Sequence, residues 1–197
     1  MPTLADIRAR LRRMLEDTDP VAPLWSDTEL NEWLAVAARE YGARFPREAT
    51  TTIAAVNGQT DYPLPTDARR VLCVESPAGY PLPRRAPRTS HEAGAAQSWA
   101  HFGGAISLGY PPTAALIVAY RGLYPFPAND AATFDLPDEG LDLAIAGATL
   151  LALERRGIAA AKRRGGSPDS TLALTAARQR YADALRRCRV VRGDVVG

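Results

Sequence analysis

The sequence predicts an α+β protein, an antiparallel bundle of about four helices with a small β-rich domain inserted between the second and third helices. Apolar residues recur every three or four positions in the first and last parts of the chain, as in amphipathic helices. In the middle, the pattern changes to short apolar runs separated by Pro and Gly, as in strands joined by turns. We therefore expect residues 1–49 and 128–189 to form the bundle, 50–127 the inserted domain and 190–197 an extended C-terminal tail.

Two helix starts are visible in the first part of the chain. Thr3 can cap a helix whose apolar stripe begins at Leu4. The second start is a capping box, in which Ser26 and Glu29 can each bond the other's backbone amide. The stripe that follows consists of Leu30, Trp33, Leu34, Ala37, Ala38 and Tyr41. Its helical spacing predicts core packing for these aromatic residues and not a platform for stacking bases.

The inserted domain contains several strand candidates. A strand over Thr51–Val56 precedes Asn57-Gly58, a strong signal for a hairpin, and the prolines of Tyr62–Pro65 are typical of a sheet edge. The stretch Arg70–Glu75 is apolar on both faces and predicts a buried strand. Further candidates are Tyr80–Arg85, Ala105–Leu108 and Ala115–Tyr120. Residues 86–104 have no clear period and predict a loop or one short helical turn.

The third helix begins at Pro137, which suits a first helical position, and it has almost no polar face. Its apolar residues include Leu141, Leu143, Ile145, Leu150, Leu151 and Leu153. A helix that is apolar all round must be buried all round, whereas a four-helix bundle covers one stripe of each member. We therefore expect Leu143, Leu150 and Leu153 to contact a neighbouring subunit. Burial of this surface by the β-rich insert is the alternative.

The last helix starts near Ser167-Pro168, and a tail of β-branched residues flanked by arginines follows it. These tail and flanking residues are Arg187, Arg189, Val190, Val191, Arg192, Val195 and Val196. The valines have strand propensity but nothing local to pair with, so they can add to an exposed sheet edge of a partner. The arginines would then seek acids on that partner. A frayed terminus without a role is the alternative.

Composition excludes several classes of protein. Hydrophobic residues make up 46% and charged residues 23% of the 197 residues, which excludes a disordered, collagen-like or disulfide-rich chain. Met1–Asp6 lacks the features of a signal peptide, and Leu141–Leu153 is too short to span a membrane. Cys73 and Cys188 lie far apart and form no metal-type pair, so we expect a reduced, cytosolic protein.

The net charge of +2 conceals a strongly polarised chain. Residues 155–192 contain eleven Lys and Arg against two acids, a local charge of +9 that leaves −7 for the remainder. This asymmetry indicates an anionic partner near the C-terminal part, either nucleic acid or an acidic protein surface. The alternative is a solvated helix face whose arginines pair with acids from the N-terminal half.

Residues suited to catalysis are scarce. The only histidines, His91 and His101, lie in the segment without a clear period, and together with Glu92 they give no template for a metal site. The paired glycines lack the Lys-Ser/Thr of a phosphate-binding loop, and no nucleophile elbow or activated Cys-His pair is present. We therefore predict no catalytic, metal or cofactor-binding residues and no enzyme.

The chain resembles the head–tail adaptor (connector) proteins of tailed bacteriophages, a group that includes podovirus tail-tubular adaptors. The motifs that carry the resemblance are Trp25–Leu34 with Tyr41, Gly58–Pro65 with Asp67 and Arg70-Val71, and Phe134–Glu139. Their order and spacing cover about residues 4–187. Each motif is mostly structural, so the resemblance rests on their combination, and the loop over 81–104 matches nothing in the family.

The resemblance implies a non-enzymatic virion protein at the head–tail junction, made in the host cytoplasm. It implies a homo-oligomeric ring, dodecameric on the portal, that extends the DNA channel and offers a platform to a tail or nozzle protein. Genomic DNA would pass through the channel without sequence specificity, and no cofactor or membrane is involved. Many family members grip the portal with the C-terminal segment, which assigns portal docking to the tail residues named above.

Two other classes of function remain open at this stage. A DNA-binding or DNA-packaging regulator would use the basic last helix to contact phosphates and would bind free duplex DNA with steep salt dependence. The arginines flank both sides of the apolar stripe, which weakens a helix-turn-helix interpretation. A hydrolase built on the β-rich insert would need a convergent polar site, which the sequence does not contain.

Overall fold

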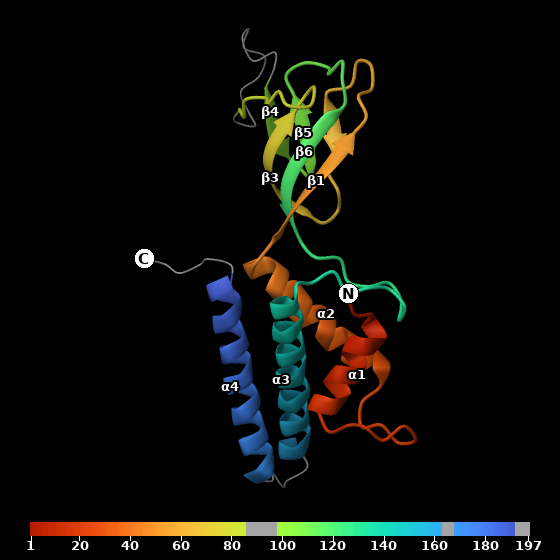
Figure 1. Cartoon of the computed structure of the whole chain (residues 1–197), viewed down its shortest axis with the longest axis vertical. Coiled ribbons are helices and arrows are strands. Elements are labelled where there is room, and N and C mark those ends of the chain that lie inside the picture. The colour runs from red at the N-terminus through yellow and green to blue at the C-terminus, as the bar shows by residue number, and fades with distance from the viewer. Residues whose placement is uncertain (86–97, 163–167, 192–197) are drawn as a thin grey trace. The chain divides into compact units, whose positions relative to one another are not determined.

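The computed structural model describes residues 1–85, 98–162 and 168–191, with the side chains of 159–170 left out of the description. The chain divides into a helical unit, Met1–Phe45 with Tyr124–Gly197, and a strand unit, Pro46–Leu123 (Figure 1). The described residues form four helices and two small antiparallel sheets, and the strands all lie between the second and third helices. The predicted α+β class is confirmed.

The first two helices both begin with a capping box. In α1 (Leu4–Met14) the Asp6 carboxylate accepts a hydrogen bond from the Thr3 N–H at 2.9 Å, and the Thr3 hydroxyl accepts from the Asp6 N–H. Ser26 and Glu29 form the same arrangement at the start of α2 (Asp27–Arg44). These bonds satisfy backbone donors that a helix start would otherwise leave without partners.

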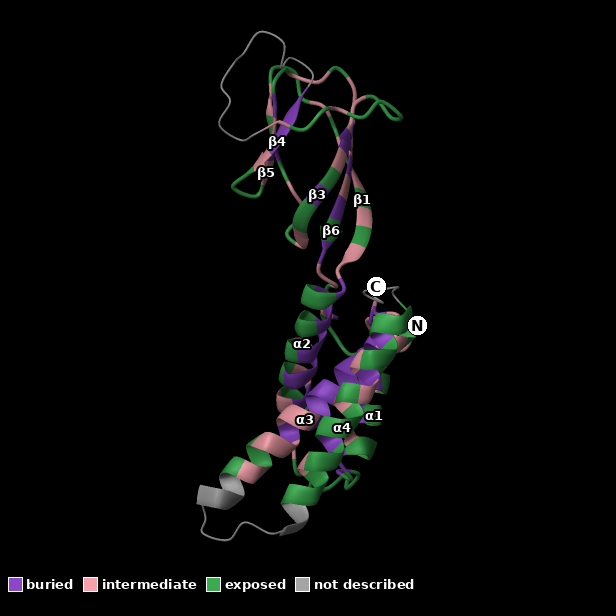
Figure 2. Cartoon of the chain, turned by 90° about the vertical axis from the view of Figure 1, so that its left-hand side faces the viewer, coloured by how far each residue is buried: buried purple, intermediate pink, exposed green. Residues whose placement is uncertain are grey.

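The central helix of the helical unit is α3 (Asp138–Lys162), which contacts α1, α2 and α4 (Pro168–Val191). Figure 2 shows buried residues gathered where these helices face one another. Core residues from the four helices include Ile7, Leu11, Leu30, Leu34, Tyr41, Leu141, Ala144, Ala148 and Ala184. Much of the apolar surface of α3 is therefore covered inside its own unit, because three helices share it.

The strand unit contains two three-stranded sheets. One has the order β1 (Arg47–Ile53), β6 (Leu116–Gly122), β3 (Ala68–Glu75), and the other the order β2 (Asp61–Pro63), β5 (Ala105–Leu108), β4 (Trp99–Phe102). Their shared core consists of Tyr62, Val71, Val74, Trp99, Ile106, Leu108, Leu116 and Val118. The edge position of β2 agrees with its proline, which cannot donate to a neighbour.

Three local expectations for the strand unit were wrong. The Asn57-Gly58 turn does not close a hairpin, because β1 pairs with β6 and β2 pairs with β5. The strand over Arg70–Glu75 is buried on one face only, since Val71 and Val74 are buried whereas Leu72 is 39% exposed. Residues Trp99–Phe102 form β4 and not a loop or a helical turn; the rest of that segment, 86–97, lies outside the described residues.

The boundaries of the helical unit also differ from those expected. The strand unit begins at Pro46 and ends at Leu123, slightly before each predicted boundary. At the C-terminal end, α4 continues through Val190 and Val191, which were expected in the extended tail. Residues 192–197 lie outside the described residues.

Candidate interaction surfaces

Groups that could support catalysis are not brought together in the described part of the chain. His101 lies on β4 and is half-buried, and His91 lies outside the described residues. The described residues contain no cluster of His, Cys, Asp and Glu that could hold a metal ion, and neither cysteine forms a disulfide. Among the helices described, none has the length and apolarity that crossing a bilayer requires.

The exposed side of α4 is basic. Its stripe of Ala177, Ala184 and Cys188 is buried, and its arginines are exposed: Arg178, Arg180, Arg186, Arg187 and Arg189. Arg178 pairs with Glu154 at 3.2 Å and Arg186 pairs with Asp183. Neither acid comes from the N-terminal half. Arg155, in the same basic segment, does act on an N-terminal acid: after the hydrogen bonds from Ser26, its charge also lowers the pKa of Glu29. Pairing with N-terminal acids is therefore supported at Arg155 and not at the described arginines of α4.

A groove of about 390 Å³ lies between α1, α3 and α4. Apolar side chains line part of it: Met14 from α1, Ile145 and Ala146 from α3, and Ala184 from α4. Charged side chains also line it, namely Arg10, Arg13, Asp142, Arg180 and Arg187. We call this the arginine groove. Sequence analysis missed it, because the arginines of α1 and α4 are far apart in the chain and meet only through helix packing.

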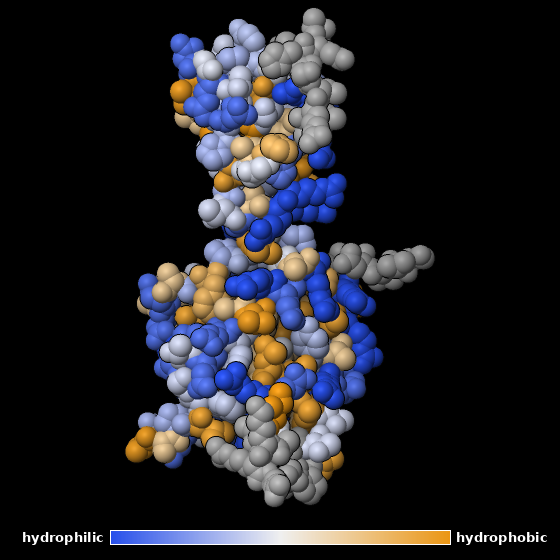
Figure 3. Space-filling model, turned by 180° about the vertical axis from the view of Figure 1, so that it is seen from behind, coloured by the Kyte–Doolittle hydropathy of each residue, from blue (hydrophilic) through white to orange (hydrophobic). Residues whose placement is uncertain are grey.

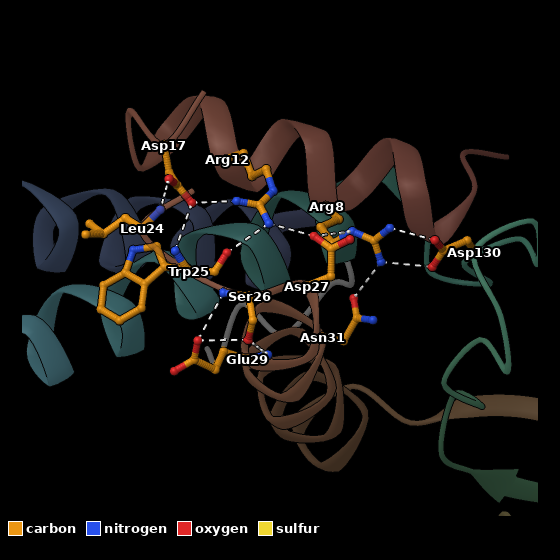
Figure 4. A network of polar contacts seen from close by, with 10 residues as sticks. All are labelled: Arg8, Arg12, Asp17, Leu24, Trp25, Ser26, Asp27, Glu29, Asn31 and Asp130. Atoms are coloured by element: carbon orange, nitrogen blue, oxygen red, sulfur yellow. Dashed lines mark hydrogen bonds and ion pairs between the residues drawn. The ribbon is translucent and has the colours of Figure 1, made fainter. Parts of the chain in front are cut away.

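On the other side of α1, the connection to α2 is held in place by a buried carboxylate. The Asp17 side chain is only 2% exposed, and its two oxygens accept hydrogen bonds from the Leu24 N–H at 2.6 Å and the Trp25 N–H at 3.3 Å (Figure 4). Arg12 donates to Asp17 at 2.5 Å and also bonds Asp27 at 2.6 Å. This network fixes both ends of the segment 15–26, which we call the α1–α2 loop.

A second arginine extends the network along α1. Arg8 is 9% exposed and donates two hydrogen bonds to Asp130, at 2.9 and 2.6 Å, and its Nε atom lies 3.2 Å from Asp27 (Figure 4). The bonds to Asp130 raise the pKa of Arg8, and those same bonds lower the pKa of Asp130. Arg8 thereby ties α1 to the start of α2 and to the segment that precedes α3.

The three residues expected at a subunit interface differ in accessibility. Leu143 is 3% exposed and belongs to the core of the helical unit, so the fold itself accounts for its apolarity. Leu153 is half-buried and packs against the same core. Leu150 is half-buried and lies four residues after Ala146, so it extends the same face of α3 beyond the arginine groove. Elsewhere on the unit, apolar side chains reach the surface between hydrophilic ones (Figure 3).

The expected docking residues at the C-terminal end are exposed where the structure describes them. Arg187 and Arg189 lie on α4, and Val190 and Val191 are 69% and 64% exposed at its end. Arg192, Val195 and Val196 lie outside the described residues. The exposed valines at the end of a basic helix suit a contact with another protein.

Comparison with protein families gives a match over nearly the whole chain. The family model described as SU10 adaptor protein matches residues 2–196. Among curated proteins, none matches the chain. The family match runs through both the helical unit and the strand unit, so it concerns nearly the whole chain.

Proposed function

Because the chain belongs to the SU10 adaptor protein family, a family of structural phage adaptors, we propose that it docks on the portal protein at the head–tail junction of a virion. The match over residues 2–196 carries this proposal. The basic α4 and the exposed valines at its end are consistent with a protein-binding role. The motifs of the sequence favour the tail-tubular type found in podoviruses.

In this proposal the protein acts as one subunit of a ring. Copies assemble around the axis of the portal, as a dodecamer, and extend its DNA channel. Genomic DNA passes through without base-specific contacts, and the ring offers its far side to a tail or nozzle protein. Leu150 and Leu153, both half-buried in the single chain, contribute to the contact between subunits.

Docking on the portal is assigned to the C-terminal segment. Val190 and Val191 at the end of α4, with Val195 and Val196 beyond it, supply apolar contacts and pairing to an exposed strand edge. Arg187, Arg189 and Arg192 contact acids on the portal, and they contribute chiefly to association rate and register.

Two truncations test this assignment. The full chain is mixed with its portal protein, and electron micrographs of the complex are compared with micrographs of a chain lacking residues 190–197. We expect rings on the portal for the full chain and a large loss of binding for the truncation. A second truncation, lacking only 192–197, keeps the whole of α4 and separates the helix end from the tail. If the chain lacking residues 190–197 binds the portal with unchanged affinity, the portal-binding contacts are made by the helices.

A DNA-binding regulator is the second candidate, because the exposed side of α4 carries five arginines. Such a protein would bind free duplex DNA in the absence of portal, with affinity falling steeply as salt rises. The adaptor proposal expects weak binding to free DNA and strong binding to portal. A titration of the purified protein with duplex DNA at two salt concentrations distinguishes the two.

A further inference from the structure

The arginine groove has more positive charge than its own unit neutralises. Arg10 pairs with Asp142 at 3.1 Å, whereas Arg13, Arg180 and Arg187 make no ion pair with any described residue. The groove also has an apolar part, formed by Met14, Ile145, Ala146 and Ala184. An occupant that matches it must therefore carry carboxylates together with an apolar side chain. A nucleic-acid backbone offers phosphates but no apolar counterpart for this lining.

The same chain carries a segment of that chemistry. Between Met14 and Ala38 there are six acids and no Lys or Arg. On the α1–α2 loop, Glu16 and Asp19 are exposed and make no ion pair with a described residue. Beside them, Val21 is 90% exposed and Leu24 is 55% exposed. The loop therefore presents carboxylates and uncovered apolar side chains together.

The loop is prepared for docking and cannot fill the groove of its own chain. Asp17 holds it by accepting from the Leu24 and Trp25 amides, which reduces the entropy that ordering on a partner would cost. Figure 1 shows the loop leaving the helical unit on the side of α1 that faces away from α4, whereas α4 forms one wall of the groove. An occupant with this chemistry must come from another molecule.

We propose that the α1–α2 loop of one copy docks in the arginine groove of a second copy of this chain. Glu16 and Asp19 then lie against Arg13 and Arg180, and Val21 covers the apolar lining. Leu150, one helical turn beyond Ala146, lies next to this contact and is covered with it. Because loop and groove are different surfaces, the contact is head-to-tail, and repetition of such a contact closes a ring when the rotation between copies divides a full turn evenly. This deepens the proposed function and rests on it for the ring.

Charge reversal on each side of the contact tests the proposal. The groove variant combines Arg13→Glu with Arg180→Glu and leaves Arg187, assigned to portal docking, unchanged. The loop variant combines Glu16→Arg with Val21→Arg. The control, Arg39→Glu with Arg156→Glu, changes the net charge as much as the groove variant does, at exposed positions of α2 and α3 that do not line the groove. Sedimentation equilibrium over a wide concentration range measures self-association, and circular dichroism checks that each variant is folded.

We expect wild type and control to self-associate equally, and each variant alone to associate at least about tenfold more weakly. A one-to-one mixture of the two variants should associate again, because each groove then faces a loop of opposite charge. Wild type that stays monomeric at every concentration, or a mixture that does not recover, overturns the proposal. So does a groove variant that associates normally but no longer binds duplex DNA, which would identify phosphate as the occupant.

Portal binding, measured in parallel, separates this contact from the proposed function. If the groove variant forms rings on the portal as wild type does, the loop–groove contact is wrong and the adaptor function stands. If wild type self-associates through the groove but does not bind portal, the contact stands and the portal-docking function is wrong.

Discussion

Replacing Asp17 with Asn should loosen the α1–α2 loop and destabilise the helical unit. The two oxygens of Asp17 accept from three donors, which belong to Leu24, Trp25 and Arg12. Oδ1 accepts from Leu24, and Oδ2 accepts from both Trp25 and Arg12. Asparagine has one acceptor oxygen, so it can serve either Leu24 or the pair Trp25 and Arg12, but not all three. The NH₂ group of asparagine would then face N–H donors that it cannot bond. Water cannot replace the lost acceptor, because the side chain at this position is only 2% exposed.

The expected loss in the free energy of unfolding depends on how many hydrogen bonds of the network remain in the variant. Breaking a buried ion pair by removing one charge costs about 3–5 kcal/mol. Here Arg12 is 20% exposed and keeps its bonds to Asp27 and to the Trp25 carbonyl. We therefore expect a loss of about 2–3 kcal/mol in the free energy of unfolding, near the value of a hydrogen bond to a charged group.

Urea unfolding followed by circular dichroism measures this loss, and thermolysin cleavage between residues 17 and 25 reports the opening of the loop. Asp19→Asn is the matched control. Asp19 is exposed and accepts from the Val21 and Ala22 amides, and asparagine can also accept there, so its stability should change by less than about 0.5 kcal/mol. If Asp17→Asn unfolds at the wild-type urea concentration and its loop is cut no faster, Asp17 does not hold the loop.

Two further predictions concern the helices. A Cβ on Gly140 would lie 2.7 Å from the ring of Tyr41, which is 1% exposed, so Gly140→Ala should lose about 1–3 kcal/mol to overpacking, partly offset by helix propensity. Gly157→Ala meets no atom within 4 Å and should gain up to about 1 kcal/mol, and equal urea midpoints for the two variants would contradict this reasoning. Hydrogen bonds from the Ser26 N–H and hydroxyl lower the pKa of Glu29, so its stabilisation is present at neutral pH and is lost as the pH falls through the carboxyl range. Glu29→Gln should therefore lose stability relative to wild type at pH 7 and approach it between about pH 5 and pH 3, as measured by urea unfolding at each pH.

Features that depend on neighbouring residues could be predicted from the sequence. The capping boxes at Thr3 and Ser26 require only residues three positions apart, and both form as expected. The stripe from Leu30 to Tyr41 is buried for the same reason, since its spacing fixes one face of a helix. These elements are specified locally, and tertiary packing agrees with the local preference.

Features that depend on distant partners could not be predicted in this way. Asn57-Gly58 makes a turn, with Gly58 at a φ of 78°, but the strand before it pairs with β6, more than sixty positions away. Trp99 was missed as a strand residue because its burial comes from the sheet partner β5 and the core of the strand unit. The arginine groove was missed for the same reason, since its two rows of arginines meet only when α1 and α4 pack on α3.

The apolar surface of α3 has two parts: one is buried within the chain, and the other remains accessible to a partner. The excess apolar surface predicted a neighbouring subunit, but Leu143 is buried in the core of its own unit, where α3 contacts α1, α2 and α4. What remains for a partner is smaller and more specific: half-buried Leu150, and a groove whose arginines the described acids of the chain leave largely without ion pairs. Two neighbouring acids have another role, because Asp27 pairs with Arg8 and Arg12 and Asp17 pairs with Arg12. These pairs hold the loop that exposes Glu16, Asp19 and Val21. In the proposed loop–groove contact, each copy satisfies the complementary surface of the next copy, and a ring subunit requires such a contact between unlike surfaces.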